Sequence, residues 1–324
     1  MNHYQMLRSV SRTFALSIEQ LPHTLREIVT IAYLLFRVSD CIEDHETLHA
    51  DRKAELLTLW ARVLRGTSAP RELTGEIADL DGSDPEVYVA QQAGAIVDQM
   101  NRLPSEPREM LVTHVCDTSL GMAKWQEHGP YVANETEMDD YMLQVAGRVG
   151  YLLTDVFAWY SPAIQKLRQR LMPLAYEFGL ALQTVNIIRG MRKDYERGWV
   201  FVPETFYEKA GLTRESLFDP ANLDRAMKVV DMLADKAGRH LIKGLSYTTL
   251  LPRMQYHIRL FCTWPLLFAV KTLAVSRHNA GVLTAEAKIT RTQVKKIVVI
   301  SKLFFWSNFC LTSYFKALNR PSPA

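Results

Sequence analysis

Three carboxylates at the end of a long apolar segment are the strongest constraint on how this chain can fold. No glycine or proline occurs from Leu25 to Asp51, and apolar residues recur at intervals of three and four, which predicts an α-helix. On that helix Asp40, Glu43 and Asp44 share one face. Like charges at this spacing repel by about 0.2–0.5 kcal/mol per pair. Two interpretations follow: a bound cation neutralises the carboxylates, or they form a solvated acidic helix end.

The side chains around these carboxylates indicate which cation would fit. Oxygen ligands suit Mg²⁺, which keeps several waters and is commonly shared between one or two carboxylates and a substrate phosphate. Arg37 lies one turn before Asp40, and Tyr33 lies one turn further back. A guanidinium in that position is well placed to hold a phosphate oxygen.

A second polar stripe lies on another apolar helix, predicted from Pro173 to Arg197. Gln183, Asn186, Gly190 and Asp194 recur there at three and four. Polar groups on so apolar a helix need partners, and metal, water and phosphate are the candidates. The glycine is unexpected, because an interior glycine costs about 1 kcal/mol relative to alanine.

Composition indicates a helical globular protein with a large core. Of 324 residues, 48% are hydrophobic and 23% charged, and only 15 Gly and 14 Pro occur, which favours long helices over a turn-rich β architecture. The net charge is +3, with the cations spread out until the C-terminus, so nucleic acid is not an expected partner. The four cysteines lack metal-finger spacing, which indicates free thiols in a reducing compartment.

Targeting signals are the next question. The first residues lack the basic region and apolar core of a signal peptide. The most apolar segment, 297–315, contains Lys302, which would be costly within a bilayer. We interpret this segment as the last core helix, with an interfacial helix as the alternative. The expected location is the cytoplasm, with peripheral membrane contact for release of an apolar product as the alternative.

Further helices are predicted where the same periodicity lies between glycine and proline breaks. These segments are Leu56–Leu64, Pro85–Arg102 with Asp84 as its cap, Arg108–Trp125, Glu137–Phe157, Leu223–His240, Arg253–Val275 with a kink at Pro265, and a last helix from Lys288. The segment Arg197–Pro203 is expected to be extended. No repeat or long linker divides the chain, so we expect one domain over 1–324.

Two polar stripes with arginines close by indicate a metal–diphosphate site inside a helical bundle, where facing helices supply the ligands. An allylic diphosphate that ionises needs its leaving group neutralised by metal and cationic side chains. The resulting carbocation needs a water-free cavity with aromatic faces. The candidate aromatic residues, each of which is alternatively plain core, are Phe14, Tyr33, Tyr141, Tyr176 and Phe178.

Four motifs in order resemble the squalene/phytoene synthase family from about Ser9 to Val299. The motifs are Ser11-Arg12-Thr13-Phe14, Asp40-Cys41-Ile42-Glu43-Asp44, the Y-x-x-x-V-A-G-x-V-G segment from Tyr141 to Gly150, and the Q-x-x-N-I-x-R segment from Gln183 to Arg189. The resemblance implies an all-α, single-domain helical bundle of the isoprenoid-synthase type with a central apolar cavity. It also implies head-to-head (1'-1) condensation of two prenyl diphosphates through a cyclopropyl intermediate.

The same resemblance assigns roles to individual residues. It implies metal ligation by Asp40, Asp44, Asn186 and Asp194, diphosphate binding by Arg12, Arg37 and Arg189, further substrate contacts from Phe14, Tyr33 and Gln183, and a catalytic Tyr141 beside the migrating cation, which is also a candidate proton relay. One departure stands out. The family's second motif has an aspartate where this chain has Gly190, which removes one expected carboxylate from the metal site.

The C-terminal third resembles the squalene branch of the family. Phe261–Ala274 carries that likeness, and so does Ala287–Arg291, where Lys288 and Arg291 are expected near an NADPH reductant. Thr290 replaces an arginine of the branch, and no Gly-rich dinucleotide fingerprint occurs, so NADPH would bind on side chains of the bundle.

The expected function is Mg²⁺-dependent condensation of two farnesyl diphosphates, via presqualene diphosphate, to squalene by a monomer or weak dimer. The alternatives that keep the ionisation are phytoene synthesis from geranylgeranyl diphosphate, a reaction that stops at the cyclopropyl diphosphate or an alcohol, and prenyl transfer to another acceptor. An alternative of another class is a non-catalytic scaffold derived from a synthase.

Overall fold

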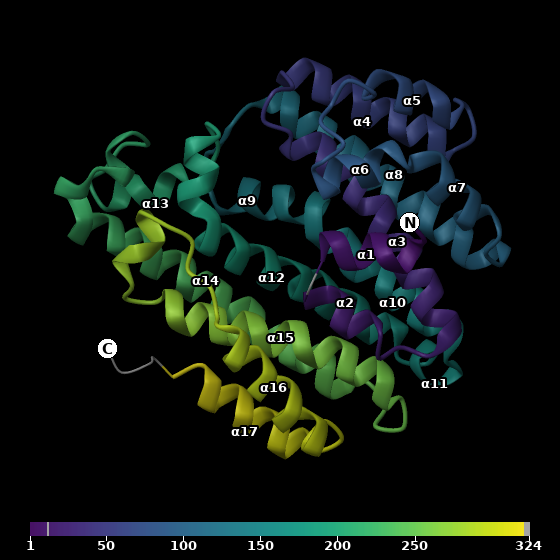
Figure 1. Ribbon diagram of the computed structural model, residues 1–324. Helices are drawn as coiled ribbons and strands as arrows, with labels where there is room; N and C mark the ends of the chain where they lie inside the picture. Colours follow the sequence, from purple (N-terminus) through teal and green to yellow (C-terminus); the bar gives the residue numbers. More distant parts are fainter. Residues whose placement is uncertain (12, 321–324) are drawn as a thin grey trace. The chain divides into compact units, whose positions relative to one another are not determined.

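Helices form most of the part of the chain that the computed structural model describes, residues 1–11 and 13–320 (Figure 1). The strands among these residues are β1 (Tyr131–Val132) and β2 (Val200–Pro203), which pair in parallel. Of the segment Arg197–Pro203 that was predicted to be extended, Val200–Pro203 is a strand, whereas Arg197 and Gly198 lie in a turn. The all-α class is confirmed.

The chain forms two compact units, and each contains two separate stretches of sequence. The first unit is Met1–Gly129 with Tyr151–Arg168, and the second is Pro130–Gly150 with the chain from Gln169 onward. The expectation of one domain over 1–324 stays a prediction.

The first unit is built around α3 (His23–Asp44), which packs against helices on several sides. Its core side chains Leu34, Leu35 and Val38 are fully buried, which leaves the acidic face as the polar side of the helix. The other helices of this unit are α1 (His3–Val10), α2 (Thr13–Ile18), α4 (Ala50–Leu64), α5 (Pro70–Glu76), α6 (Pro85–Gln91), α7 (Ala93–Asn101), α8 (Ser105–His128), α11 (Pro162–Gln165) and most of α10 (Arg148–Tyr160).

The second unit is built on long helices. It contains α9 (Glu135–Met142), a π-helix (Leu143–Gly147), α12 (Arg168–Glu196), α13 (Glu204–Lys209), 3₁₀ turns at Ser216–Phe218, Pro220–Asn222 and Ala280–Leu283, and the helices α14 (Leu223–Leu250), α15 (Tyr256–Ser276), α16 (Arg291–Phe304) and α17 (Asn308–Leu318). Among these, α14 packs on α15, and α15 packs on both α16 and α17 (Figure 1).

Small residues bring the segment after Tyr141 directly against α12. A Cβ atom added at Gly150 would lie 2.4 Å from the carbonyl oxygen of Ala175, and one added at Gly179 would lie 2.6 Å from that of Ala146. Side chains larger than hydrogen do not fit at these distances. Close helix packing therefore accounts for Gly150.

Several predicted helix boundaries are wrong in the same way. α12 begins at Arg168 with Pro173 inside it, and α8 begins at Ser105 with Pro107 inside it. Pro107 is the third residue of α8, where proline is tolerated because the first four N–H groups of a helix have no intrahelical acceptor. Pro173 is the sixth residue of α12, so it removes one intrahelical hydrogen bond without ending the helix. The Asp84 cap is confirmed, since its side chain accepts a 2.7 Å hydrogen bond from the Glu86 N–H.

The interpretation of 297–315 as one last core helix is wrong. The segment contains the end of α16, a corner at 305–307 and most of α17, which begins where Ser307 caps the Cys310 N–H. Several of its apolar side chains are exposed. Composition could not reveal this, because an apolar residue has the same sequence signature on either face of a helix.

Two other helices, α12 and α15, are long and apolar enough to cross a membrane by length and composition. Of their most apolar windows, 56% and 83% respectively are buried inside the protein, and the core helix of a soluble protein passes the same test. The choice between a cytoplasmic and a membrane location therefore stays a prediction. The predicted free thiols are confirmed for all four cysteines.

Candidate active site

The acidic face of α3 carries a compact cluster of polar side chains. Arg37 lies at its centre: its Nη2 donates to the Tyr33 hydroxyl at 2.7 Å, and its Nη1 pairs with Glu86 at 3.1 Å and with Asp40 at 3.7 Å. The ring of Phe14 lies 6.1 Å from that of Tyr33. The predicted residues Phe14, Tyr33, Arg37 and Asp40 are thus brought together, whereas Arg12 lies outside the described residues.

The electrostatics of this cluster are unusual. Desolvation raises the pKa of Asp40 to about 6; the charge of Arg37 lowers it, while the charges of Asp44 and Glu86 raise it further. Burial disfavours the charged form of Arg37, but Asp40, Tyr33 and Glu86 outweigh it, and the net pKa of the guanidinium is raised. Glu86, at the start of α6, was not predicted, because nothing in its local sequence distinguishes it from a surface residue.

On α12 the residues of the second polar stripe make few contacts with one another. The Asn186 amide lies 3.5 Å from the Gln183 side-chain oxygen, at the limit of a hydrogen bond. The Asp194 carboxylate accepts a short 2.6 Å hydrogen bond from Arg197, three residues on. Arg197 was not predicted, although its i,i+3 spacing from Asp194 was a usable signal.

Gly190 leaves open space rather than a tight contact. A Cβ atom added there would meet only the Asp194 Oδ2, at 3.8 Å, which is ordinary van der Waals distance. The residue lies within α12 and does not have a positive φ. Aspartate, the residue of the family motif, would therefore fit at this position with its carboxyl near that of Asp194.

Glu286 connects two residues that were predicted separately. It pairs with Arg189 at 3.0 Å and with Lys288 at 2.5 Å. Arg189 is the predicted diphosphate ligand of α12, and Lys288 is a predicted reductant contact. Arg291, the other predicted reductant contact, is the first residue of α16. The sequence offered no signal for Glu286, since its partners are decided by packing.

Tyr141 belongs to an aromatic stack within the second unit. Its side chain is buried, and its ring stacks on Phe201 at 4.3 Å with an interplanar angle of 15°. Phe201 in turn stacks on Trp199 at 5.2 Å. Phe178, another predicted wall residue, packs in the core against Tyr247 with ring centroids 5.8 Å apart. Phe201 and Trp199, on and beside β2, were not predicted.

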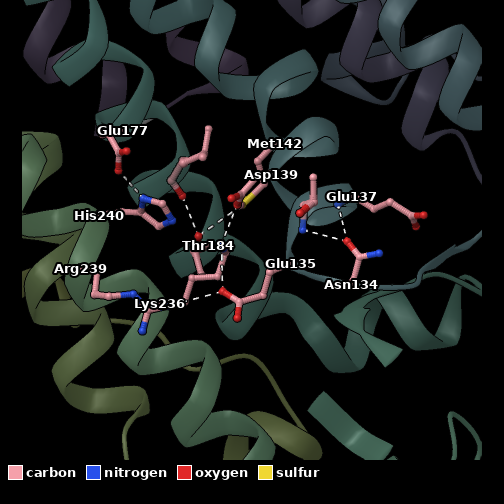
Figure 2. Close-up of polar contacts among 12 residues, drawn as sticks. Asn134, Glu135, Glu137, Asp139, Met142, Glu177, Thr184, Lys236, Arg239 and His240 are labelled. Carbon is pink, nitrogen blue, oxygen red and sulfur yellow. Dashed lines mark hydrogen bonds and ion pairs between the residues drawn. The ribbon is translucent and has the colours of Figure 1, made fainter. Parts of the chain in front are cut away.

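A buried lysine ties α9, which carries Tyr141, to α14. Figure 2 shows Lys236 beside two carboxylates of α9; its amine lies 2.6 Å from Asp139 and 3.4 Å from Glu135. The residue is only 2% exposed. On the α12 side, the Thr184 hydroxyl lies 3.3 Å from the sulfur of Met142. Ion pairs and this weak hydrogen bond thus hold α9 from its first residue to its last.

The same view contains a direct link between α12 and α14. His240 Nδ1 lies 2.6 Å from the carboxylate of Glu177, and the histidine side chain is mostly buried (Figure 2). This contact joins the two helices at one point along their length.

The donor set on α3 suits a magnesium ion shared with substrate. Its ligands are carboxylate oxygens. Burial raises the pKa of Asp40, and the charges of Asp44 and Glu86 add to the rise, so a divalent cation would favour the ionised form of this carboxyl. Among the residues that the structure describes, no group of three or more His, Cys, Asp or Glu side chains forms a complete cage. Mg²⁺ commonly takes only one or two carboxylates, with waters and phosphate oxygens as its other ligands. The residues present therefore fit this ion.

Relatives of known function share most of this chain. The squalene synthase of Schizosaccharomyces pombe is 27% identical over 304 residues, covering 92% of this chain and 64% of that protein. Squalene synthase LSS of Botryococcus braunii is 28% identical over 303 residues and the human squalene synthase 26% over 300, with 63% and 68% of those proteins covered. The chain thus spans about two thirds of the length of these relatives.

Solved structures show the same fold. The structure of TcSQS with the ligand BPH1237 superposes with a TM-score of 0.80 at 23% identity, covering 99% of this chain and 92% of that one. A dehydrosqualene synthase in complex with a ligand gives a TM-score of 0.62 at 15% identity, covering 97% of this chain and 95% of that one. These likenesses confirm the isoprenoid-synthase fold.

The family model described as squalene/phytoene synthase matches residues 7–293. That range contains the four motifs and every predicted site residue. The chain therefore belongs to the squalene/phytoene synthase family.

Proposed function

We propose that this protein is a Mg²⁺-dependent prenyltransferase that condenses two farnesyl diphosphates head to head, via presqualene diphosphate, to squalene. The observation that carries the proposal is the family match over 7–293, together with squalene synthases as relatives across more than nine tenths of the chain. The cluster of polar side chains on α3 and, separately, the polar stripe on α12 support it.

Cationic side chains on α3 and on α12 would bind the diphosphates. Arg37 pairs with Asp40 and Glu86, and Arg189 pairs with Glu286. A phosphate oxygen of the substrate would replace these carboxylates as the acceptor. Asp40 and Asp44, and Asn186 and Asp194, would hold Mg²⁺. The ion supplies Lewis-acid neutralisation of the leaving diphosphate.

The carbocation needs an environment that stabilises charge without supplying water. Aromatic faces attract a cation through their quadrupole. The stack of Tyr141, Phe201 and Trp199 offers such faces, and its central contacts are too close to admit water. Tyr141 carries the one ionisable hydroxyl of this stack, so it is the candidate proton relay.

Reduction of the intermediate to squalene would require NADPH, which supplies a hydride. Lys288 and Arg291 would hold its phosphates, and they flank Thr290, which caps α16. Since Lys288 pairs with Glu286, a bound phosphate would compete with that carboxylate.

Product analysis tests the proposal directly. The full chain is incubated with Mg²⁺ and either farnesyl or geranylgeranyl diphosphate, with and without NADPH. Squalene from farnesyl diphosphate with NADPH is expected, and phytoene from geranylgeranyl diphosphate, with farnesyl diphosphate ignored, would refute it. The Asp40→Ala and Asp44→Ala variants should be inactive with unchanged helical circular dichroism. A wild-type protein that yields no product, and whose melting temperature does not respond to Mg²⁺ with a non-hydrolysable farnesyl diphosphate analogue, would instead favour the scaffold alternative.

A further inference from the structure

The corner between α16 and α17 exposes a group of large apolar side chains. Val299, Leu303, Trp306 and Phe309 are 61%, 73%, 56% and 80% exposed. We call these four residues the corner patch. Soluble monomers rarely expose large apolar residues side by side without a function.

The corner patch lies on the outer side of two helices whose inner sides are buried in the protein. On their inner side, Ile297 and Ser301 of α16 and Leu311 and Phe315 of α17 are buried, and both helices lie beside α15 (Figure 1). The indole N–H of Trp264 on α15 donates to the Ser301 hydroxyl at 2.9 Å. Both helices thus carry apolar side chains on two sides, and the described residues of the chain cover only the inner one.

A buried arginine holds the corner in this conformation. Arg259, fully buried on α15, donates from Nε and Nη2 to the carbonyl oxygen of Phe305 at 3.2 and 3.1 Å. Its Nη2 also donates to the Asn308 side-chain oxygen at 2.7 Å. Trp306 therefore projects from a backbone that is fixed on both sides. Little conformational entropy remains to be lost when the patch is covered.

The charged side chains of the two helices that carry the corner patch have one sign. From Ala287 to Arg320 the sequence contains no aspartate or glutamate. The cations in this stretch are Lys288, Arg291, Lys295, Lys296, Lys302, Lys316 and Arg320. Of these, Lys295, Lys296 and Lys302 are exposed on α16, within a turn of Val299 or Leu303.

We propose that the α16–α17 corner is a docking surface for a bilayer that contains anionic lipid. Tryptophan and phenylalanine are side chains that enter the boundary between headgroups and acyl chains. Lysines beside them gain about 1 kcal/mol each from an anionic leaflet. The corner combines both contributions on a rigid base.

The charges argue against a second copy of the chain as the occupant. A two-fold contact places the same surface on both subunits, so it would bring two all-cationic clusters together without a carboxylate between them. A bilayer with anionic headgroups meets the same surface with opposite charge. The proposal goes beyond the proposed enzymatic function and does not depend on it, because binding to lipid is measured without turnover.

Co-sedimentation of the full chain with vesicles tests the proposal. Vesicles of phosphatidylcholine alone are compared with vesicles of equal parts phosphatidylcholine and phosphatidylglycerol. We expect binding to the anionic vesicles that weakens with added salt. The Leu303→Ser/Phe309→Ser variant should lose at least about tenfold in affinity, from the lost apolar burial. The Lys295→Glu/Lys296→Glu variant should lose at least about tenfold from the reversed charge.

A matched control distinguishes binding through the corner patch from non-specific adsorption to vesicles. Ile242 on α14 is 57% exposed, and the Ile242→Ser variant should bind vesicles like wild type. All substituted positions are exposed, so melting temperatures should stay close to wild type. The proposal is overturned if wild type ignores anionic vesicles, if the corner variants bind them like wild type, or if Ile242→Ser weakens binding equally. It is also overturned if the corner variants abolish a dimer in lipid-free solution and leave vesicle binding unchanged.

Discussion

Replacing Asp40 by asparagine should stabilise the metal-free protein while it destroys the metal site. The pKa of this carboxyl is about 6 in the folded protein against an ordinary value of 3.8, so the folded state holds the proton more tightly than the unfolded chain. The stabilising contribution of the protonated form is complete below pH 3.8 and is lost as the pH rises through 6. Above pH 6 the charged carboxylate therefore favours unfolding. Asparagine has no such charge.

The magnitude follows from the difference between the two pKa values. At 1.36 kcal/mol per unit, it corresponds to about 3 kcal/mol. The Asp40 side chain keeps 33% of its surface exposed, so solvent screening reduces the expected gain to about 1–2 kcal/mol. At about 2.1 cal/mol/K per residue, cooperative unfolding of the whole chain would then shift by about 1.5–3 °C.

The assay is thermal unfolding in a chelator, for wild type and Asp40→Asn, between pH 4 and pH 8. The two melting temperatures should be close at the acid end and diverge as the pH rises through about 6. Asp98→Asn is the control, because Asp98 is exposed on α7, and it should change stability by less than about 0.5 kcal/mol at any pH.

Adding Mg²⁺ with a non-hydrolysable farnesyl diphosphate analogue should reverse the order of the two proteins. Wild type should gain melting temperature through ligand linkage, and Asp40→Asn should gain little. If Asp40→Asn is less stable than wild type at pH 7.5 without metal, the electrostatic reasoning is wrong. If it responds to Mg²⁺ and the analogue like wild type, Asp40 is not a metal ligand.

Three other substitutions test the rest of the site. Gly190→Asp adds a carboxyl near that of Asp194 without a clash, so the Mg²⁺ concentration for half-maximal initial rate should fall about two- to tenfold. If wild type is inactive at every Mg²⁺ concentration and Gly190→Asp is active, the wild-type metal site is degenerate. If Gly190→Asp needs as much Mg²⁺ as wild type, or is inactive, the glycine is a functional part of an altered site. Glu286→Gln removes the charge that pairs with Arg189, so the KM for farnesyl diphosphate should fall up to about fivefold; a higher KM would show that Glu286 positions the arginine for binding. Lys236→Met leaves two carboxylates of α9 without their buried partner and should cost about 1–3 kcal/mol in urea unfolding, with Lys236→Arg closer to wild type; a loss below about 0.5 kcal/mol would contradict this anchoring role.

The local part of the site could be predicted because helical spacing is local. Asp40 lies one turn after Arg37 and two turns after Tyr33, so a helix places all three on one face whatever surrounds it. The same holds for Asn186 and Asp194 on α12. Family motifs then added the expected roles, and the family match supports the choice of family. The metal, the reductant and the chemistry of each residue stay predictions.

Partners from distant parts of the chain could not be predicted. Glu86 is 49 residues from Arg37 in sequence, and it reaches the guanidinium because α6 packs on α3. Phe201 reaches Tyr141 because β2 lies beside α9. Each of these contacts changes the chemistry of a predicted residue, through its charge or its packing, and none leaves a periodic signal in the sequence.

By itself, the sequence determined the all-α class, the two polar helix faces and the family, since all three depend on short-range periodicity and on motifs that are each at most ten residues long. Only the tertiary structure decided that Glu86 pairs with Arg37 and Glu286 with Arg189, and that the apolar segment after Ile297 turns a corner with Trp306 and Phe309 exposed. The physical reason is that hydrophobicity and charge belong to a residue, whereas burial and pairing belong to the packing of whole helices against one another.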